Sequence, residues 1–280
     1  MQLNPVLVAS LAVAALVDLL APVVLAIFLA RRYRCRWRYW LYGLLVFLLS
    51  QGITRVPAML YFQTRPAVAE ALKQPVWFWT FLVFAAFTAG LFEEGGRWLA
   101  FRWAIPPAER RWPTALMLGA GHGGLESIGI GLLTLGTLAG YLAITLLPPG
   151  SLGIPASQIE EARKQFTGIH GWEALLGGWE RLGALAVQVA LTVLVLQAFL
   201  RGRRWWWYAL GFHTLVDFSS LALLHVAREN WGWGLQAASL LTEGLVTVYA
   251  LVGLWLIAAL RQPSGKEVDQ LVGDSAIEEY

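Results

Sequence analysis

Residues 76–101 read VWFWTFLVFAAFTAGLFEEGGRWLAF, an apolar and aromatic run that contains Glu93, Glu94 and Arg97. The run is long enough to span a bilayer as a helix. One charge at membrane depth costs at least ~2.5–3.5 kcal/mol on the mildest insertion scales, so three charges in one span indicate a role. On a helix both glutamates lie within one turn of Arg97, at i,i+4 and i,i+3. Arg97 can hold one carboxylate and leave the other for chemistry. The alternative is a buried ion pair that only fixes helix packing.

The composition is that of a membrane protein. Of the 280 residues, 58% are hydrophobic and 14% are charged, against ~25% charged in soluble domains. We expect an all-α, polytopic transmembrane helical bundle with about seven spans of roughly 20 or more residues each. The predicted spans are residues 4–30, 39–62, 75–101, 113–147, 173–200, 205–227 and 232–260. Cys35 is the only cysteine, which excludes an intramolecular disulfide, a cysteine-based zinc site and an iron–sulfur cluster.

The basic residues are distributed unevenly over the loops. The loops after spans 1, 3 and 5 and the tail hold thirteen Lys and Arg, whereas the loops after spans 2, 4 and 6 hold five. The positive-inside rule then places the amino terminus outside and the carboxyl terminus in the cytoplasm, in what we expect to be a prokaryotic plasma membrane. We predict one membrane domain over residues 1–262 and a polar, disordered cytoplasmic tail over residues 263–280. The arginines form short topology-setting clusters, and nothing indicates a nucleic-acid partner.

Two further stretches are unusual. Residues 119–131 read GAGHGGLESIGIG, where the lack of side-chain bulk allows close helix packing and would also give a substrate or a metal access to the helix surface. Helix packing is the simpler interpretation. Residues 157–165 read SQIEEARKQ and predict a short surface helix on the outer side, with Ser157 and Glu160 forming a capping box.

Two histidine–acid pairs lie inside the predicted spans. His122 and Glu126 are i,i+4 on span 4, and His213 and Asp217 are i,i+4 on span 6, so each pair projects from one helix face. Imidazole and carboxylate are natural ligands of a divalent metal such as zinc. With ~1.5 Å of rise per residue, the two histidines and Glu93 lie ~12–14 Å from the cytoplasmic ends of their spans. Three helices therefore bring these groups to one level.

The remaining charged residues within the spans fall into two groups. Asp18 and Arg55 lie at similar mid-membrane depth on spans 1 and 2, and we predict a structural ion pair between them. Glu243 lies near the middle of span 7 and is a possible accessory site residue. Glu180, beside Arg181 near the outer end of span 5, is another.

These motifs resemble those of known intramembrane proteases. The CAAX-processing and bacteriocin-immunity superfamily and the related PrsW family carry Glu-Glu-x-x-x-Arg or Glu-Glu-x-x-Lys, then Phe-x-x-x-His or Phe-x-x-x-Glu, then His-x-x-x-Asn or His-x-x-x-Asp. Glu93-Glu94-Gly-Gly-Arg97 resembles the first and His213-Thr-Leu-Val-Asp217 the third. His122-Gly-Gly-Leu-Glu126 resembles the second, with His122 in place of phenylalanine, and the YhfC family of predicted intramembrane metalloproteases has this His-Gly-x-x-Glu version.

The resemblance implies a zinc-dependent intramembrane endopeptidase that hydrolyses a peptide bond of a membrane protein or peptide. It implies metal ligation by Glu126, His213 and Asp217. His122 is a candidate fourth ligand, and the resemblance leaves open whether the metal has three protein ligands or four. A metal can activate water and polarise the scissile carbonyl, and a nearby glutamate can carry the proton. We assign that role to Glu93, with Glu94 as the substitute. The alternatives are a proton- or metal-coupled transporter, whose pathway would use the same buried groups, and a catalytically silent scaffold.

Overall fold

The computed structural model describes residues 2–168 and 170–262, and within these ranges it contains helices and no strand. Seven helical segments within the described ranges are long and apolar enough to cross a membrane. These segments are α1 Pro5–Tyr33; α2 Trp37–Leu49 with η1 Ser50–Arg55 and α3 Val56–Gln63; α5 Pro75–Leu99 with η2 Ala100–Ala104; α6 Trp112–Leu146; α8 Ala174–Leu200; α9 Arg204–His225 with η5 Val226–Asn230; and α10 Leu235–Ala259. The predicted all-α bundle is confirmed, and the predicted tail at residues 263–280 lies outside the described residues.

Short helices lie between the spans. They are α4 Pro66–Ala71, η3 Pro107–Glu109, η4 Pro149–Ser151 and α7 Ala156–Thr167. The predicted surface helix at 157–165 is therefore present as α7, but the predicted capping box is wrong. The helix begins one residue earlier, after Pro155, so Ser157 already lies in the first turn and no side chain caps the helix. Glu160 instead forms an ion pair with Arg163.

The second span changes its winding in the middle. Its helix continues without a break from Trp37 to Gln63, but residues Ser50–Arg55 form a π-helical turn. Pro57 explains the position of this turn, because proline has no N–H to donate and its ring clashes with the carbonyl four residues earlier. Single π turns inside α-helices are frequent at functional sites.

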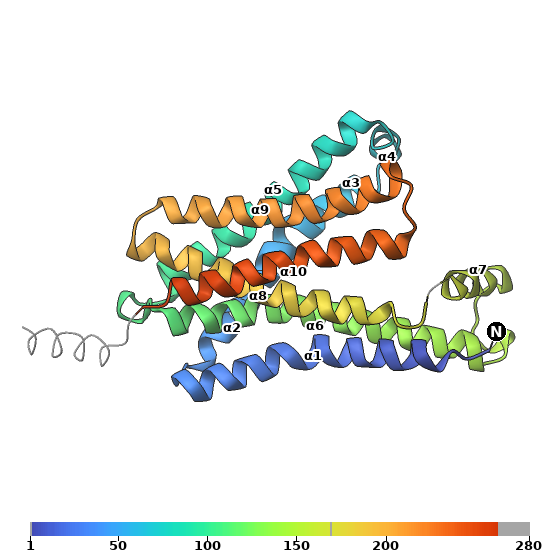
Figure 1. Cartoon of the computed structure of the whole chain (residues 1–280), viewed down its shortest axis with the longest axis horizontal. Helices are drawn as coiled ribbons and strands as arrows, with labels where there is room; N and C mark the ends of the chain where they lie inside the picture. Colours follow the sequence, from blue (N-terminus) through green and yellow to red (C-terminus); the bar gives the residue numbers. More distant parts are fainter. Residues whose placement is uncertain (1, 169, 263–280) are drawn as a thin grey trace, which may run out of the picture.

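The spans form two groups that meet at α8. In Figure 1, α1 and α6 run side by side in one group and α5 and α9 in the other. α6 packs against α1, α2 and α8, while α9 packs against α5, α8 and α10. α8 is the most enclosed span, because 72% of its most apolar window is buried, against 17–33% for the other six.

Glycines let α2 and α6 approach until their backbones touch. A Cβ atom on Gly121 of α6 would lie 2.0 Å from the Trp40 carbonyl oxygen, and one on Gly43 of α2 would lie 2.1 Å from the Leu118 carbonyl oxygen. Real Cβ atoms do not come this close to backbone atoms, so neither position has room for alanine. Close packing therefore accounts for Gly121, as the simpler interpretation of the glycine-rich stretch predicts, whereas Gly129 in the same stretch has nothing within 4 Å of its Cβ position.

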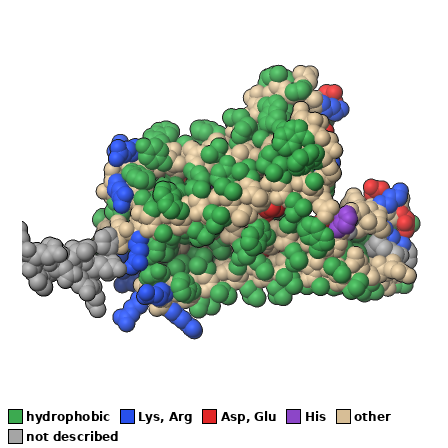
Figure 2. All heavy atoms as spheres, in the orientation of Figure 1, with side chains coloured by type: hydrophobic (Ala, Val, Ile, Leu, Met, Phe, Trp, Pro, Cys, Tyr) green, Lys and Arg blue, Asp and Glu red, His purple; other side chains and the backbone are tan. Residues whose placement is uncertain are grey.

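The surface is apolar along the helices and basic at one end. Figure 2 shows Lys and Arg side chains gathered mainly at the end where α8 gives way to α9, and mixed acidic and basic side chains at the opposite end. At that opposite end, close to α7, α1 begins with Asn4, whose side chain caps the helix by accepting from Val6 N and Leu7 N. The apolar surface along the helices, with charged side chains at the two ends, is that of an integral membrane protein, in agreement with the hydropathy of the spans.

Candidate active site

The three charged residues of α5 are all buried. Glu93, Glu94 and Arg97 expose 3%, 0% and 0% of their surface. The helix presses against α9 at Gly90, where a Cβ would lie 3.1–3.3 Å from atoms of Leu210, His213 and Thr214. α5 is thereby positioned so that its acidic pair faces the His213 side of α9.

Glu94 and Arg97 form one side of this arrangement. Arg97 donates from Nη1 to Glu94 Oε1, and His213 Nδ1 lies 2.6 Å from the same oxygen. A neutral His213 therefore carries its proton on Nδ1 and leaves the lone pair of Nε2 free. This is the tethering that carboxylates provide to metal-binding histidines, because it fixes both the tautomer and the ring orientation.

Glu93 is the centre of a second set of contacts. Gln51 Nε2 donates to Glu93 Oε1 at 2.7 Å, and His122 Nε2 lies 2.9 Å from Glu93 Oε2. Arg97 Nη2 is 3.7 Å from Glu93 Oε2, within ion-pair range but beyond a hydrogen bond. The sequence predicts that Glu93, His122 and His213 lie at the same depth in the membrane. In the structure Glu93 Oε2 lies 2.9 Å from His122 Nε2 and 3.8 Å from His213 Nε2.

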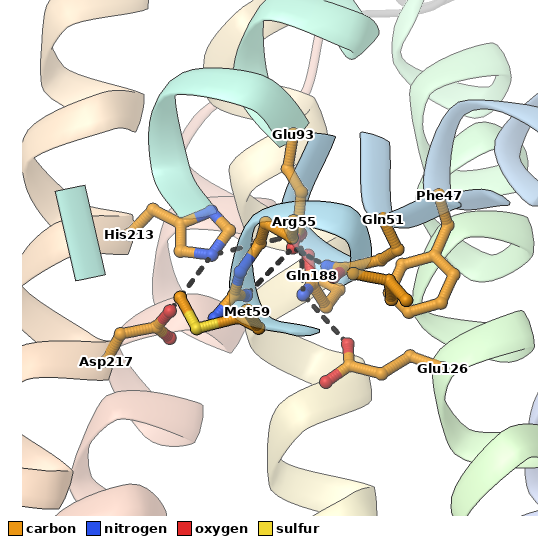
Figure 3. Close-up of a pocket in the computed structure, with 10 residues that line it drawn as sticks. Phe47, Gln51, Arg55, Met59, Glu93, Glu126, Gln188, His213 and Asp217 are labelled. Carbon is orange, nitrogen blue, oxygen red and sulfur yellow. Dashed lines mark hydrogen bonds and ion pairs between the residues drawn. The ribbon is translucent and has the colours of Figure 1, made fainter. Parts of the chain in front are cut away.

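A cavity of about 290 Å³ opens beside Glu93. The residues that line it come from five spans. Figure 3 shows their side chains converging on the cavity. Its polar lining consists of Gln51, Arg55, Glu93, Glu126, Gln188, His213 and Asp217, and its apolar lining of Phe47, Val56 and Met59. Of the three charged residues on α5, only Glu93 reaches this cavity.

The second span contributes a stripe to this cavity. Phe47, Gln51, Arg55 and Met59 recur every four residues. In a continuous α-helix four residues advance by about 400°, so each side chain would lie about 40° further round than the last. The wider π turn at Ser50–Arg55 offsets this drift and keeps the stripe facing the cavity.

Gln188 on α8 joins the two acidic motifs. Its side-chain oxygen accepts from Arg97 Nη2, and its amide nitrogen donates to Glu126 Oε2 at 3.0 Å and lies 3.4 Å from Glu93 Oε2. Arg181 binds the other oxygen of Glu126 at 3.0 Å and also pairs with Glu180. A continuous polar network therefore runs from α5 through α8 to α6.

The donor set suits a divalent metal, although its side chains are not drawn together as ligands. Within the described ranges, no three His, Cys, Asp or Glu side chains are already arranged to hold an ion. His213 Nε2 lies 3.7 Å from Asp217 Oδ2 and 3.8 Å from Glu93 Oε2 and makes no hydrogen bond to any residue that the structure describes. Ligand atoms of a tetrahedral zinc site lie about 3.3–3.6 Å apart, close to the spacing of His213 and Asp217.

Several predicted residues lie elsewhere. His122 is fully buried behind Glu93 and does not line the cavity, and neither do Glu180 and Glu243. The predicted ion pair between Asp18 and Arg55 is wrong. Within the described residues Asp18 Oδ1 is buried without a partner, because α1 packs on α6 and α8 while η1 turns Arg55 towards the cavity.

Sequence reasoning missed Gln51, Arg55 and Gln188 as site residues. Gln188 carried a usable signal, because it is an amide within the apolar run 182–196 and a buried amide needs partners. Gln51 and Arg55 carried a weaker signal, since the π turn that aims them at the cavity is not visible in the hydropathy pattern.

Comparison with known proteins agrees with the motifs. The family model described as YhfC intramembrane metalloprotease matches residues 17–231. The "Uncharacterized membrane protein YhfC" of Bacillus subtilis (strain 168) is 29% identical over 260 residues, which cover 90% of this chain and 95% of that protein. No solved structure matches. The family match extends from the first span to the end of the sixth and includes every residue that lines the cavity. The chain therefore belongs to the YhfC intramembrane metalloprotease family.

Proposed function

We propose that this protein is a metal-dependent endopeptidase that hydrolyses a peptide bond of a membrane protein or peptide within the bilayer. One observation carries the proposal: Glu94 anchors His213 through Nδ1, while Nε2 faces a cavity that it shares with Asp217 and Glu93. A structural ion pair alone would not need an imidazole with a free lone pair beside two carboxylates.

The proposed ligands are His213, Asp217 and Glu126, all of which line the cavity. The ion would be zinc or another divalent cation, since imidazole and carboxylate suit several such metals. When bound, it would activate a water molecule and polarise the scissile carbonyl. His122, which the motif also suggests as a ligand, is here a hydrogen-bond partner of Glu93 and is proposed to orient it.

Glu93 is the proposed general base. It is the α5 carboxylate that reaches the cavity, and Gln51 and His122 hold its two oxygens in place. It takes a proton from the attacking water and delivers it to the leaving amine. Glu94 acts differently, because its Oε1 is occupied by Arg97 and His213 and it does not line the cavity.

Two isosteric variants test this division of roles. Glu93→Gln should keep the metal and the melting temperature but lose ~10²–10⁴-fold in turnover, because an amide cannot accept the proton. Glu94→Gln should lower the melting temperature, since an unpaired buried charge costs about 3–5 kcal/mol. Each detergent-purified variant is assayed for metal content, melting temperature and cleavage of a membrane peptide.

Four outcomes contradict parts of the proposal. Full cleavage by Glu93→Gln removes Glu93 as the base. If Glu94→Gln is then inactive but stable, the two glutamates exchange roles. If the native protein binds no metal and cleaves no membrane peptide, the chain is a scaffold of the same fold. If it moves a metal ion or protons across the membrane without cleaving a peptide, it is a transporter.

A further inference from the structure

Three arginines lie more than one helical turn from either end of their spans, namely Arg55, Arg97 and Arg181. Two of them are neutralised by carboxylates and hydrogen-bonded. Arg97 is fully buried and donates to Glu94 and Gln188. Arg181 donates to Glu126 and Glu180. Both have the partners that a charge in a membrane protein requires.

Arg55 differs from the other two. Its guanidinium makes no hydrogen bond within the described residues, and its Nε is buried without a partner. The nearest carboxylate oxygen is Glu93 Oε1, 4.0 Å from Nη1, which is too far for a hydrogen bond. A guanidinium offers five N–H donors in a planar fork, so Arg55 has its hydrogen-bonding capacity unused.

The position of Arg55 makes that capacity available to a ligand. Its side chain is 26% exposed and lines the cavity, and it is the one Lys or Arg among the lining residues. The other charged lining residues are the acids Glu93, Glu126 and Asp217. Among the charged side chains that line the cavity, the three acids repel an anionic group and Arg55 attracts it.

We propose that Arg55 binds a negatively charged oxygen of the substrate. This inference rests on the proposed function for the identity of the substrate as a peptide. The oxygen has two possible sources: the oxyanion that forms at the scissile carbonyl, or a free carboxylate at the carboxyl end of the peptide. Both accept a charge-assisted, two-pronged hydrogen bond from a guanidinium, which is stronger than a neutral one and which lysine cannot reproduce.

The test uses two peptides with the same apolar sequence, one ending in a free carboxylate and the other in an amide. Binding to the detergent-purified protein is measured by fluorescence anisotropy, and cleavage is measured separately. The variants are Arg55→Gln and Arg55→Lys. Arg65→Gln is the matched control, because it also removes one positive charge, ten residues after Arg55. Arg65 is exposed and stacks on Tyr61.

If the carboxylate is the ligand, Arg55→Gln weakens binding of the free acid by about tenfold or more and leaves binding of the amide unchanged. If the oxyanion is the ligand, the same variant lowers kcat for both peptides to a similar extent and leaves their binding unchanged. Arg55→Lys should recover only part of either effect. If Arg55→Gln does not fold, binding and cleavage by Arg55→Lys test the inference instead.

The inference is overturned if Arg55→Gln and Arg55→Lys bind and cleave both peptides within twofold of the native protein and of Arg65→Gln. It is overturned equally if the native protein binds both peptides alike and cleaves neither. Failure of the proposed function gives a different pattern: neither peptide is cleaved, but the free acid still binds better than the amide and Arg55→Gln abolishes that preference.

Discussion

Glu93 and Glu94 are neighbours in the chain and have different surroundings because consecutive helix residues point about 100° apart. That rotation turns Glu93 towards the cavity and Glu94 towards Arg97 and His213. The residue types and their spacing allowed this division to be anticipated from the sequence. The amides that contact Glu93 could not be anticipated, because Gln51 and Gln188 come from helices whose rotation the sequence does not reveal.

At the same scale, His213 is predicted to be required for metal binding. His213→Ala removes an imidazole nitrogen that lies at the cavity and makes no hydrogen bond within the described part of the chain. Loss of a residue that only supports a ligand typically costs 10–100-fold in affinity. We therefore expect His213→Ala to lose more than about 100-fold in metal affinity, measured by elemental analysis after dialysis. His170→Ala is the control, since His170 is exposed and pairs with Glu173. Equal metal content in both variants would exclude the site.

Gln188 provides a prediction about stability. Gln188→Leu leaves the buried Arg97 and the partly buried Glu126 each short of a hydrogen bond, and a hydrogen bond to a charged group contributes about 1.5–3 kcal/mol. We expect a clear drop in melting temperature. Gln197→Leu on the same helix is the matched control. The Gln197 side chain has one long hydrogen bond, 3.5 Å to the Val193 carbonyl, and its oxygen has no partner among the described residues. A control as destabilised as Gln188→Leu would show that the network contributes nothing specific.

At the scale of the helical elements, hydropathy predicted the spans because each needs about 20 apolar residues to cross the bilayer. The predicted ends lie within three residues of those observed, as for 205–227 against Arg204–Asn230. Depth along a span was predictable in the same way, since it follows from the rise per residue. The sequence does not reveal which helices are neighbours. The prediction that Asp18 and Arg55 form a pair, which rests on their equal depth alone, is therefore wrong.

The α2–α6 contact gives a prediction of its own. Gly121→Ala should separate the two helices, because its Cβ would lie 2.0 Å from the Trp40 carbonyl oxygen and neither backbone can move alone. Overpacking typically costs 1–3 kcal/mol, and a backbone clash belongs at the upper end. Gly129→Ala is the control on the same helix, with nothing within 4 Å of its Cβ. The melting temperature in detergent measures both, and similar values would mean that α6 shifts without cost.

For the whole molecule, the sequence predicts orientation and the surface supports it. The basic end in Figure 2 is the end where α8 gives way to α9, which the positive-inside rule assigns to the cytoplasm. We propose that the amino terminus lies outside and that the loop between α1 and α2 faces the cytoplasm. That loop contains Cys35, the single cysteine of the chain.

Cys35 allows this orientation to be measured. A membrane-impermeant maleimide should label it in inside-out vesicles and not in intact cells. Burial raises the pKa of the Cys35 thiol despite the opposing effect of Arg111, so less thiolate is present at neutral pH than for an exposed cysteine, and labelling should accelerate as the pH rises. A Cys35→Ser, Ser157→Cys variant moves the thiol to exposed α7 and should reverse the pattern. Labelling of Cys35 from outside would refute the orientation.

The ion pair within α5 also matters for how the protein is made. α5 is synthesised before α6, α8 and α9, so at that moment Glu93 has neither His122 nor Gln188 beside it. Glu94 is in a different position, because Arg97 lies one turn away on the same helix and needs no later segment to neutralise it. The nascent span thus enters the lipid with its own counter-ion, and its unmatched charge at insertion is one rather than three.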